Sequence, residues 1–253
     1  MVYFVGAGPG AEDLLTLRGA ALLEKADVVV YAGSLVNPAL LKRCKTGAEI
    51  HDSARLDLNE VLDILIPAAK AGKRVVRLHT GDPSVYGAHR EQMDALQAAG
   101  VPYAVCPGVS SFFGAAASLG AEYTLPGVSQ TVILTRAAGR TPVPEKEKLS
   151  ALAVHGASMV LFLSAGRAAE AVSELLAGGR YTPETPAAIV YKATWPDERI
   201  IRTTLGELAA DAKAAGITKT ALLLIGDFLG AQYDNSKLYD PSFTTEFREG
   251  KQA

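Results

Sequence analysis

The chain has 253 residues, of which 49% are hydrophobic and 21% are charged, and its formal net charge is -2. A chain of this length can form one large hydrophobic core or two smaller ones, and the composition is that of a globular protein. The near-neutral charge argues against a general nucleic-acid-binding protein, which usually has a clear excess of basic residues. No hydrophobic run approaches the roughly 20 residues of a membrane-spanning helix, and the first residues lack the basic segment of a signal peptide.

The cysteines and histidines give no indication of a disulfide or a metal site. Cys44 and Cys106 are far apart in the sequence, and no further cysteines stand near them at the spacing of metal ligands. Disulfides are rare in the cytoplasm, so we expect two reduced thiols in a cytoplasmic protein. The histidines show no ligand spacing either, and no metal is expected.

In the first half of the chain, short segments rich in β-branched residues alternate with segments rich in alanine and leucine. The former predict strands over residues 2–5, 28–31, 75–79 and 103–106. The latter predict helices over residues 15–26, 58–71, 88–99 and 112–119. This alternation predicts an α/β domain with a largely parallel sheet, here over residues 1–122.

A second α/β domain is predicted over residues 128–230, after a joint at Pro126 and Gly127. Its expected strands cover residues 131–135, 159–163, 188–191 and 221–225. Its expected helices cover residues 145–153, 167–176 and 205–215. Residues 231–253 are polar but contain four aromatic residues, which predicts a tail that docks on the folded chain: Tyr233, Tyr239, Phe243 and Phe247.

The first predicted strand leads into the glycine-rich loop "GAGPG" at residues 6–10. A dinucleotide-binding loop of the type Gly-x-Gly-x-x-Gly presents free backbone amides to a pyrophosphate. Pro9 removes one such amide. The acidic residue that would bind the ribose is also missing, because Ala32-Gly33-Ser34 follows the second strand. The loop therefore departs from a nicotinamide nucleotide site in two respects.

Two more loops rich in glycine and proline follow predicted strands, "HTGDPSVYG" and "CPGVSS". Ligands of a parallel sheet bind beyond the carboxyl ends of its strands, so we expect the three loops to converge on one site. None is rich in lysine or arginine, which predicts a polar but not strongly anionic ligand. The simpler alternatives are an Asp-Pro turn at Asp82 and a helix cap at Ser110 or Ser111.

Taken together, the segments "VGAGPGAEDLLTLRG", "GDPSVYG" and "CPGVSS" resemble the signature of the tetrapyrrole (precorrin) methylases, over nearly the whole chain. The resemblance implies two α/β domains of the tetrapyrrole methylase type, with S-adenosylmethionine in the cleft between them. It implies that the first glycine loop forms the floor of the active site. It also implies a homodimer with a tetrapyrrole as its substrate and with no nucleic acid or membrane as partner.

Within this family, "VYAGSLVNPALL", "TRAAGRTPVPEKEKL" and "SKLYDPSFTTEFR" are similar to the members that methylate precorrin-4 at carbon 11 in cobalamin synthesis. The implied reaction yields precorrin-5 and S-adenosylhomocysteine. A cobalt-containing substrate and another ring carbon are the open alternatives within the family. Members acting on uroporphyrinogen carry an arginine just after the second loop, where this chain has Ala88, so a role of that arginine does not carry over.

The resemblance implies cofactor contacts in both halves of the chain. In the first half they fall on Pro9, Gly81, Asp82, Val85, Tyr86, Ser110 and Ser111. In the second half they fall on Leu163, Ser164, Tyr191, Lys192, Ala193, Thr220 and Ala221. Packing in the hydrophobic core is the alternative explanation for Leu163.

The carboxylates of a tetrapyrrole favour arginine, whose planar guanidinium binds a carboxylate through two hydrogen bonds. The candidates for this role are Arg55, Arg90, Arg136 and Arg140. Methyl transfer to an electron-rich carbon depends on alignment more than on acid or base, so no catalytic residue is assigned. The candidates that we consider are Tyr86, Arg90 and His79.

Two other classes of protein remain as alternatives. A nicotinamide oxidoreductase would need the pyrophosphate amides and the acidic residue that the first loop and second strand lack. A non-catalytic tetrapyrrole carrier would have no need of the three cofactor loops.

Overall fold

The computed structural model describes residues 1–251, which divide into two compact units. Unit 1 comprises Met1–Ser118 together with Lys192–Glu198. Unit 2 comprises Leu119–Tyr191 and the chain from Arg199 onward. The division differs from the predicted domains in two places, because residues 119–122 belong to unit 2 and residues 192–198 to unit 1.

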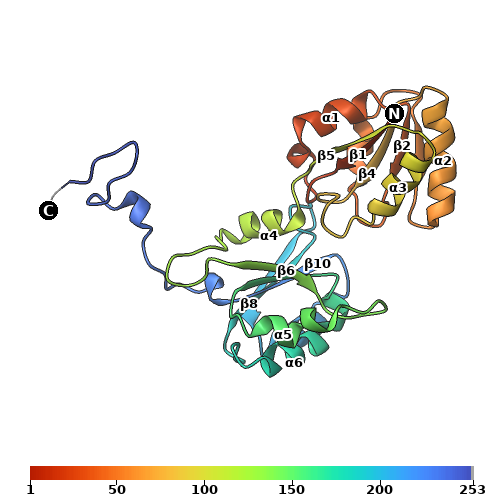
Figure 1. The fold of residues 1–253 in the computed structure, drawn as a ribbon. Helices are drawn as coiled ribbons and strands as arrows, with labels where there is room; N and C mark the ends of the chain where they lie inside the picture. The colour runs from red at the N-terminus through yellow and green to blue at the C-terminus, as the bar shows by residue number, and fades with distance from the viewer. Residues whose placement is uncertain (252–253) are drawn as a thin grey trace. The chain divides into compact units, whose positions relative to one another are not determined.

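Unit 1 is built on a five-stranded sheet in which every pairing is parallel, as predicted (Figure 1). The strand order is β3-β2-β4-β1-β5. The strands are β1 (Val2–Gly6), β2 (Val28–Tyr31), β3 (Glu49–Asp52), β4 (Val75–His79) and β5 (Tyr103–Cys106). The helices are α1 (Leu17–Glu24), α2 (Leu58–Lys70), α3 (Arg90–Ala98) and α4 (Ser111–Leu119), with 3-10 turns η1 (Glu12–Leu14) and η2 (Pro38–Arg43).

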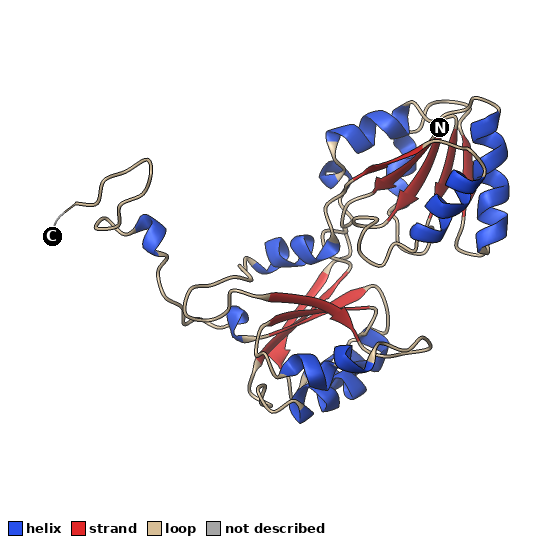
Figure 2. Ribbon diagram, viewed as in Figure 1, coloured by secondary structure: helices blue, strands red, loops and turns tan. Residues whose placement is uncertain are grey.

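Alternate residues of the strands of unit 1 enter two hydrophobic cores, because successive side chains of a strand point to opposite faces. On one face Val5 packs with Leu23 of α1. On the other face Phe4 packs with Leu65 of α2 and Leu96 of α3. Figure 2 shows the corresponding layers, with α1 on one side of the sheet and α2 and α3 on the other. Both faces are covered, as a parallel sheet requires.

Unit 2 contains a mixed five-stranded sheet of order β6-β7-β10-β8-β9. Only β6 and β7 are parallel, whereas the other three pairings are antiparallel. The strands are β6 (Val132–Arg136), β7 (Ser158–Phe162), β8 (Pro186–Tyr191), β9 (Arg199–Thr204) and β10 (Ala221–Ile225). The helices are α5 (Leu149–Ala153), α6 (Ala168–Ala177) and α7 (Leu208–Ala214), with 3-10 turns η3 (Glu145–Glu147), η4 (Ala165–Arg167), η5 (Asp227–Leu229) and η6 (Lys237–Tyr239).

A hydrophobic core joins the sheet of unit 2 to its helices. Leu161 of β7 and Leu223 of β10 pack there with Leu175 of α6 and Leu208 of α7, and none of the four has exposed surface. The strands β3 and β9 were not predicted. Both lie at an edge of their sheet and neither contains a buried residue, so they lack the buried β-branched pattern by which the other strands were recognised.

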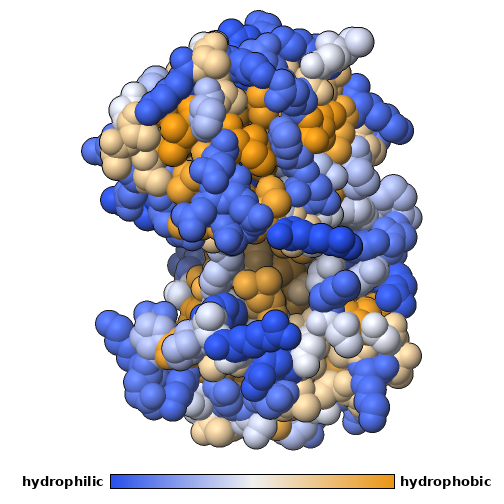
Figure 3. All heavy atoms as spheres, turned by 90° about the vertical axis from the view of Figure 1, so that its right-hand side faces the viewer, coloured by the Kyte–Doolittle hydropathy of each residue, from blue (hydrophilic) through white to orange (hydrophobic). Residues whose placement is uncertain are grey.

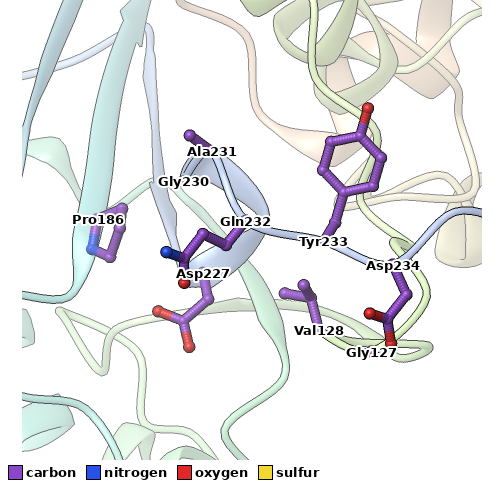
Figure 4. A pocket seen from close by; sticks show the side chains of 9 residues that line it. All are labelled: Gly127, Val128, Pro186, Asp227, Gly230, Ala231, Gln232, Tyr233 and Asp234. Carbon is purple, nitrogen blue, oxygen red and sulfur yellow. The ribbon is translucent and has the colours of Figure 1, made fainter.

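The C-terminal tail begins at an open pocket of unit 2 (Figure 4). The backbone N–H of Asp234 donates to the Pro126 carbonyl at 3.0 Å, and a Cβ atom added to Gly127 would lie 2.3 Å from an Asp234 carboxylate oxygen. Beyond this contact, Arg248 donates to three carbonyl oxygens within the tail itself. Tyr239 and Phe247 are 79% and 91% exposed. The tail thus contacts unit 2 where it begins, whereas docking of its aromatic residues stays a prediction, and residues 252–253 lie outside the described residues.

Over residues 1–251, none of the helices combines the length and the hydrophobicity needed to cross a bilayer. Figure 3 shows hydrophilic side chains interspersed with hydrophobic ones over one face of the molecule.

Candidate functional site

The three glycine-rich loops of unit 1 meet at the carboxyl ends of β1, β4 and β5. Gly8 and Gly81 exchange backbone hydrogen bonds of 3.2 Å and 2.9 Å. A Cβ atom on Gly6 would lie 2.6 Å from the Gly108 Cα and 2.6 Å from the Gly81 carbonyl oxygen. Real side chains cannot approach so closely, so glycine is required where these backbones cross. The predicted convergence of the loops is confirmed.

The carboxylate of Asp82 fastens two of these loops to each other. One oxygen accepts from the Gly108 N–H at 2.8 Å, and the other accepts from the Ser84 N–H at 2.8 Å and from the Ser84 hydroxyl. Partial burial raises the pKa of Asp82, but the hydrogen bonds from Ser84 and Gly108 outweigh it and hold the pKa below its usual value. Asp82 therefore forms the predicted turn and also positions the third loop.

Several of the predicted cofactor residues have a strained backbone conformation. Among residues 1–251, six non-glycine residues have a positive φ, namely Tyr86, Ala88, Leu163, Lys192, Thr194 and Thr220. Four of these six (Tyr86, Leu163, Lys192 and Thr220) were predicted to contact the cofactor. A left-handed backbone costs free energy in a residue with a side chain, and such residues persist mainly where function requires them.

Leu163 shows this strain most clearly. It follows β7 with φ 54°, and 67% of its surface is exposed. The alternative explanation, packing in the hydrophobic core, is therefore wrong for this residue. Its neighbour Ser164 is fully buried, donates to the Phe162 carbonyl at 2.7 Å and accepts from the Ala137 N–H at 2.8 Å. Ser164 thus fixes a turn on which Leu163 is held out toward solvent.

The remaining predicted cofactor residues lie at strand ends or helix starts. The Ser110 carbonyl accepts from Phe113 N–H at 3.1 Å, and Ser111 is the first residue of α4. Val85 donates its N–H to the Asp82 carbonyl at 3.3 Å. Tyr191 ends β8, and Ala221 begins β10 directly after the strained Thr220.

Sequence reasoning missed the importance of Trp195. Its indole N–H donates to the Pro9 carbonyl at 3.1 Å, and the Ala11 N–H donates to the Thr194 hydroxyl at 3.0 Å. These bonds place the segment 192–198 on the first glycine loop, within unit 1. The available signal was that Trp195 is the only tryptophan of the chain.

Two buried basic residues, Arg77 and His79, lie on β4, which leads into the second glycine loop. Burial lowers the pKa of His79 to about 3, with contributions from Arg77 and His89, so the imidazole is neutral at neutral pH. Its Nε2 has no hydrogen-bond partner among the described residues. Arg77 donates to Gln92 and to the Val30 carbonyl, each at 3.2 Å, and burial lowers its pKa to about 10.

The four candidate arginines differ in their surroundings. Arg90 pairs with Asp94 at 2.9 Å, and its side chain is 80% exposed. Arg136 donates to three backbone carbonyls in the loop that follows β6. Arg55 and Arg140 are exposed. The structure does not gather these residues into one cluster within either unit, and their role toward a substrate stays a prediction.

The pocket in Figure 4 is not the predicted site. It lies where the tail leaves unit 2, and its described lining contains none of the predicted cofactor or substrate residues. The candidate residues of unit 1 lie mainly on the glycine loops, and those of unit 2 lie at or beside strand ends, two of them with a strained backbone.

Comparisons with known proteins indicate the family of the chain. A model of the tetrapyrrole (corrin/porphyrin) methylases matches residues 1–209. A cobalt-precorrin-4 C(11)-methyltransferase of Methanocaldococcus jannaschii is 52% identical over 98% of this chain and 96% of the relative. A precorrin-4 C(11)-methyltransferase of Mycobacterium tuberculosis is 48% identical over 94% and 95%.

Solved structures give the same result. A cobalt precorrin-4 methyltransferase of cobalamin biosynthesis superposes with a TM-score of 0.88, at 48% identity, over 91% of this chain and 96% of that chain. A uroporphyrin-III C-methyltransferase from Thermus thermophilus, solved with S-adenosylhomocysteine, gives a TM-score of 0.73 at 30% identity, over 90% of this chain and 93% of that chain. The chain belongs to the tetrapyrrole methylase family.

Proposed function

We propose that this protein transfers a methyl group from S-adenosylmethionine to carbon 11 of precorrin-4, with or without bound cobalt, in the synthesis of the corrin ring of vitamin B12. The names of relatives that match nearly the whole chain support this reaction. The observation in the chain itself that carries the proposal is the strained backbone at four of the predicted cofactor residues.

The residues fit this cofactor chemically. When bound, S-adenosylmethionine supplies an electrophilic methyl group on a positively charged sulfur. The loops of unit 1 offer mainly backbone groups and small side chains, and the hydrogen bonds of Asp82 already occupy both of its carboxylate oxygens. Tyr86 and Leu163 are 46% and 67% exposed and can cover apolar parts of a ligand. A lining made mainly of backbone groups and small side chains suits a reaction in which positive charge disappears.

Alignment is the main catalytic contribution that we assign to the chain. Holding two reactants in line can supply most of the barrier reduction in a displacement at carbon. The glycine contacts between Gly6, Gly81 and Gly108 make the first unit's loops rigid enough for this task. His79 is buried and neutral, so we assign it a role in supporting the second loop rather than in proton transfer.

The arginines are proposed to bind the carboxylates of the tetrapyrrole. Arg55 and Arg140 are exposed and can reach a ligand without breaking a described contact. Arg90 would have to exchange Asp94 for the substrate. Arg136 already supports a loop through three carbonyls, so its contribution would be to shape that loop.

We also propose that the protein acts as a homodimer in the cytoplasm. The free thiols of Cys44 and Cys106 support a reducing compartment. The proposal of a homodimer rests on the resemblance to the tetrapyrrole methylases. Light scattering coupled to size-exclusion chromatography would test the dimer.

The test of the reaction is incubation with S-adenosylmethionine and a panel of precorrin intermediates, each with and without cobalt. Mass spectrometry should detect one added methyl group, and NMR should place it on carbon 11. Methylation at another carbon would assign another step of the same synthesis. Binding of the tetrapyrrole without turnover would indicate a carrier, and binding of NAD in place of S-adenosylhomocysteine would indicate an oxidoreductase.

A further inference from the structure

We infer that Trp195 is a positioning residue, which locks the connection between β8 and β9 onto the first glycine loop and thereby fixes Pro9 relative to Lys192 and Ala193. The inference rests on the proposed function, because these three residues are proposed to contact the cofactor. It assigns to Trp195 and Gly10 a role that neither the motif nor the comparisons assign.

Two hydrogen bonds join the segment to the loop on either side of Gly10. The Trp195 indole N–H donates to the Pro9 carbonyl at 3.1 Å. The Ala11 N–H donates to the Thr194 hydroxyl at 3.0 Å. The chain thus leaves the sheet of unit 2 after Tyr191, makes these contacts within unit 1, and returns at Arg199.

Gly10 is a glycine because the indole needs its space. A Cβ atom there would lie 2.0 Å from Trp195 Cδ1 and 2.4 Å from Nε1. Gly8 has φ 80° and needs glycine for its backbone conformation, whereas Gly10 is outside the left-handed region. The two glycines of one short loop therefore serve different purposes, and that of Gly10 is to admit Trp195.

Contacts of Glu198 and Lys192 also hold the segment 192–198 in place. The Glu198 carboxylate accepts from the Ser118 hydroxyl at 2.6 Å and from the Thr194 N–H at 2.5 Å. The Lys192 ammonium pairs with Asp197 at 2.5 Å and lies 5.2 Å from the centre of the Trp195 ring, within the range of a cation–π interaction.

These contacts stabilise a strained backbone. Lys192 and Thr194 have φ values of 49° and 67°. Such conformations persist only where the surroundings enforce them. Ala193, between them, is 5% exposed, and its carbonyl oxygen would lie 2.9 Å from a Cβ atom on Gly10. Without the indole, the bond to Pro9 is lost and the strained turn at Ala193 can relax, so both would move from their positions.

The experiment uses the full-length protein and S-adenosylhomocysteine. Because Trp195 is the only tryptophan, its fluorescence in the wild-type protein should change when S-adenosylhomocysteine is added. Calorimetry should give a Kd that is about ten-fold higher in Trp195→Ala than in the wild type. In Trp195→Phe, which keeps an aromatic ring but loses the indole hydrogen bond, the Kd should be about three- to five-fold higher. Pro196→Ala, at an exposed position of the same turn, is the matched control and should bind as the wild type does.

A double-mutant cycle separates positioning from general damage. Gly10→Ala should weaken binding in the wild-type background, because its Cβ displaces the indole. In the Trp195→Ala background the same change should cost much less, since only the Ala193 carbonyl remains in its way. The KM for S-adenosylmethionine should rise in these variants more than the KM for the tetrapyrrole.

The outcomes are distinguishable. Wild-type protein that does not bind S-adenosylhomocysteine overturns the proposed function and this inference with it. Wild-type binding together with an unchanged Kd in folded Trp195→Ala, or additive effects in the cycle, overturns this inference alone. Should Trp195→Ala fail to fold, Trp195→Phe and Gly10→Ala decide, and an unchanged Kd in both would refute the role.

Discussion

The strand ends of the two sheets differ in their residues and backbone conformation. In unit 1, backbones cross so closely at Gly6, Gly81 and Gly108 that only glycine fits. In unit 2, the strand ends after β7 and before β10 carry Leu163 and Thr220, which have side chains and nevertheless adopt a left-handed backbone. The glycines of unit 1 allow backbones to approach closely, whereas Leu163 and Thr220 hold a strained backbone. We therefore expect substitutions of these three glycines to affect mainly stability, and substitutions of Leu163 or Thr220 to affect mainly binding.

The largest effect is expected from Gly108→Ala. Its Cβ would lie 2.2 Å from the Gly81 carbonyl oxygen and 2.7 Å from the Gly6 Cα, which are backbone atoms that cannot rotate away. The free energy of unfolding should fall by about 3 kcal/mol or more, as measured by urea denaturation. Gly139→Ala, where the nearest atom is 3.8 Å away, should change it by less than about 0.5 kcal/mol. Equal stability of the two variants would refute the close-approach explanation.

Acid should destabilise unit 1 through His79. The pKa of the folded state, about 3, lies below the ordinary value of 6.5, so the unfolded chain binds the proton more readily. Stability is then fully present above pH 6.5 and is lost as the pH falls toward 3, by at most about 1.4 kcal/mol per pH unit, or roughly 2 kcal/mol by pH 5. His79→Gln should flatten this slope, and His155→Gln, at an exposed position, should leave it unchanged. An unaltered slope in His79→Gln would show that other groups cause the acid sensitivity.

A smaller effect, of opposite sign, is expected from Leu163→Gly. Glycine adopts φ 54° without strain, and the exposed leucine contributes little packing, so stability should rise by up to about 1 kcal/mol. Affinity for S-adenosylhomocysteine should fall at the same time, because the apolar contact is lost. The control is Leu161→Ala on the preceding strand β7, where Leu161 is fully buried, and this variant should lose about 2–5 kcal/mol. A less stable Leu163→Gly with normal binding would contradict the functional explanation.

The smallest effect on stability is expected from Arg90→Ala. The pair with Asp94 is exposed, and such pairs contribute little to the free energy of unfolding. If Arg90 binds the substrate, its KM should still rise about ten-fold, while affinity for S-adenosylhomocysteine stays constant. Asp94→Asn removes the same ion pair but keeps the arginine, so an equal rise of KM in both variants would show that only the pair matters.

The sequence predicted unit 1 more completely than unit 2 for a physical reason. Close approach of backbones requires a particular residue, so Gly6, Gly81 and Gly108 were visible as a pattern before their contacts were known. A strained backbone does not require one residue type, so it leaves no pattern in the sequence. Leu163 follows an apolar strand and was as consistent with core packing as with a cofactor contact. Only resemblance to a family placed it among the cofactor residues.

Contacts between residues far apart in the sequence were the second feature that could not be predicted. Nothing in the local pattern relates Gly10 to Trp195, since the hydrogen bond at this contact joins residues 186 positions apart. Arg77 was read only as part of a strand, although it is buried and donates to Gln92. Arg90 and Asp94, four residues apart on one helix, were a local pair, and such a pair could be anticipated.

The return of the chain to unit 1 at residues 192–198 also constrains the order of folding. During synthesis, residues 1–118 emerge long before Trp195, so the space above Gly10 stays open while the strands of unit 2 up to β8 are being made. Closing so long a loop is costly in chain entropy and slow to occur. We therefore expect the first glycine loop to be among the last parts of the molecule to become rigid, although it lies within the first ten residues of the chain.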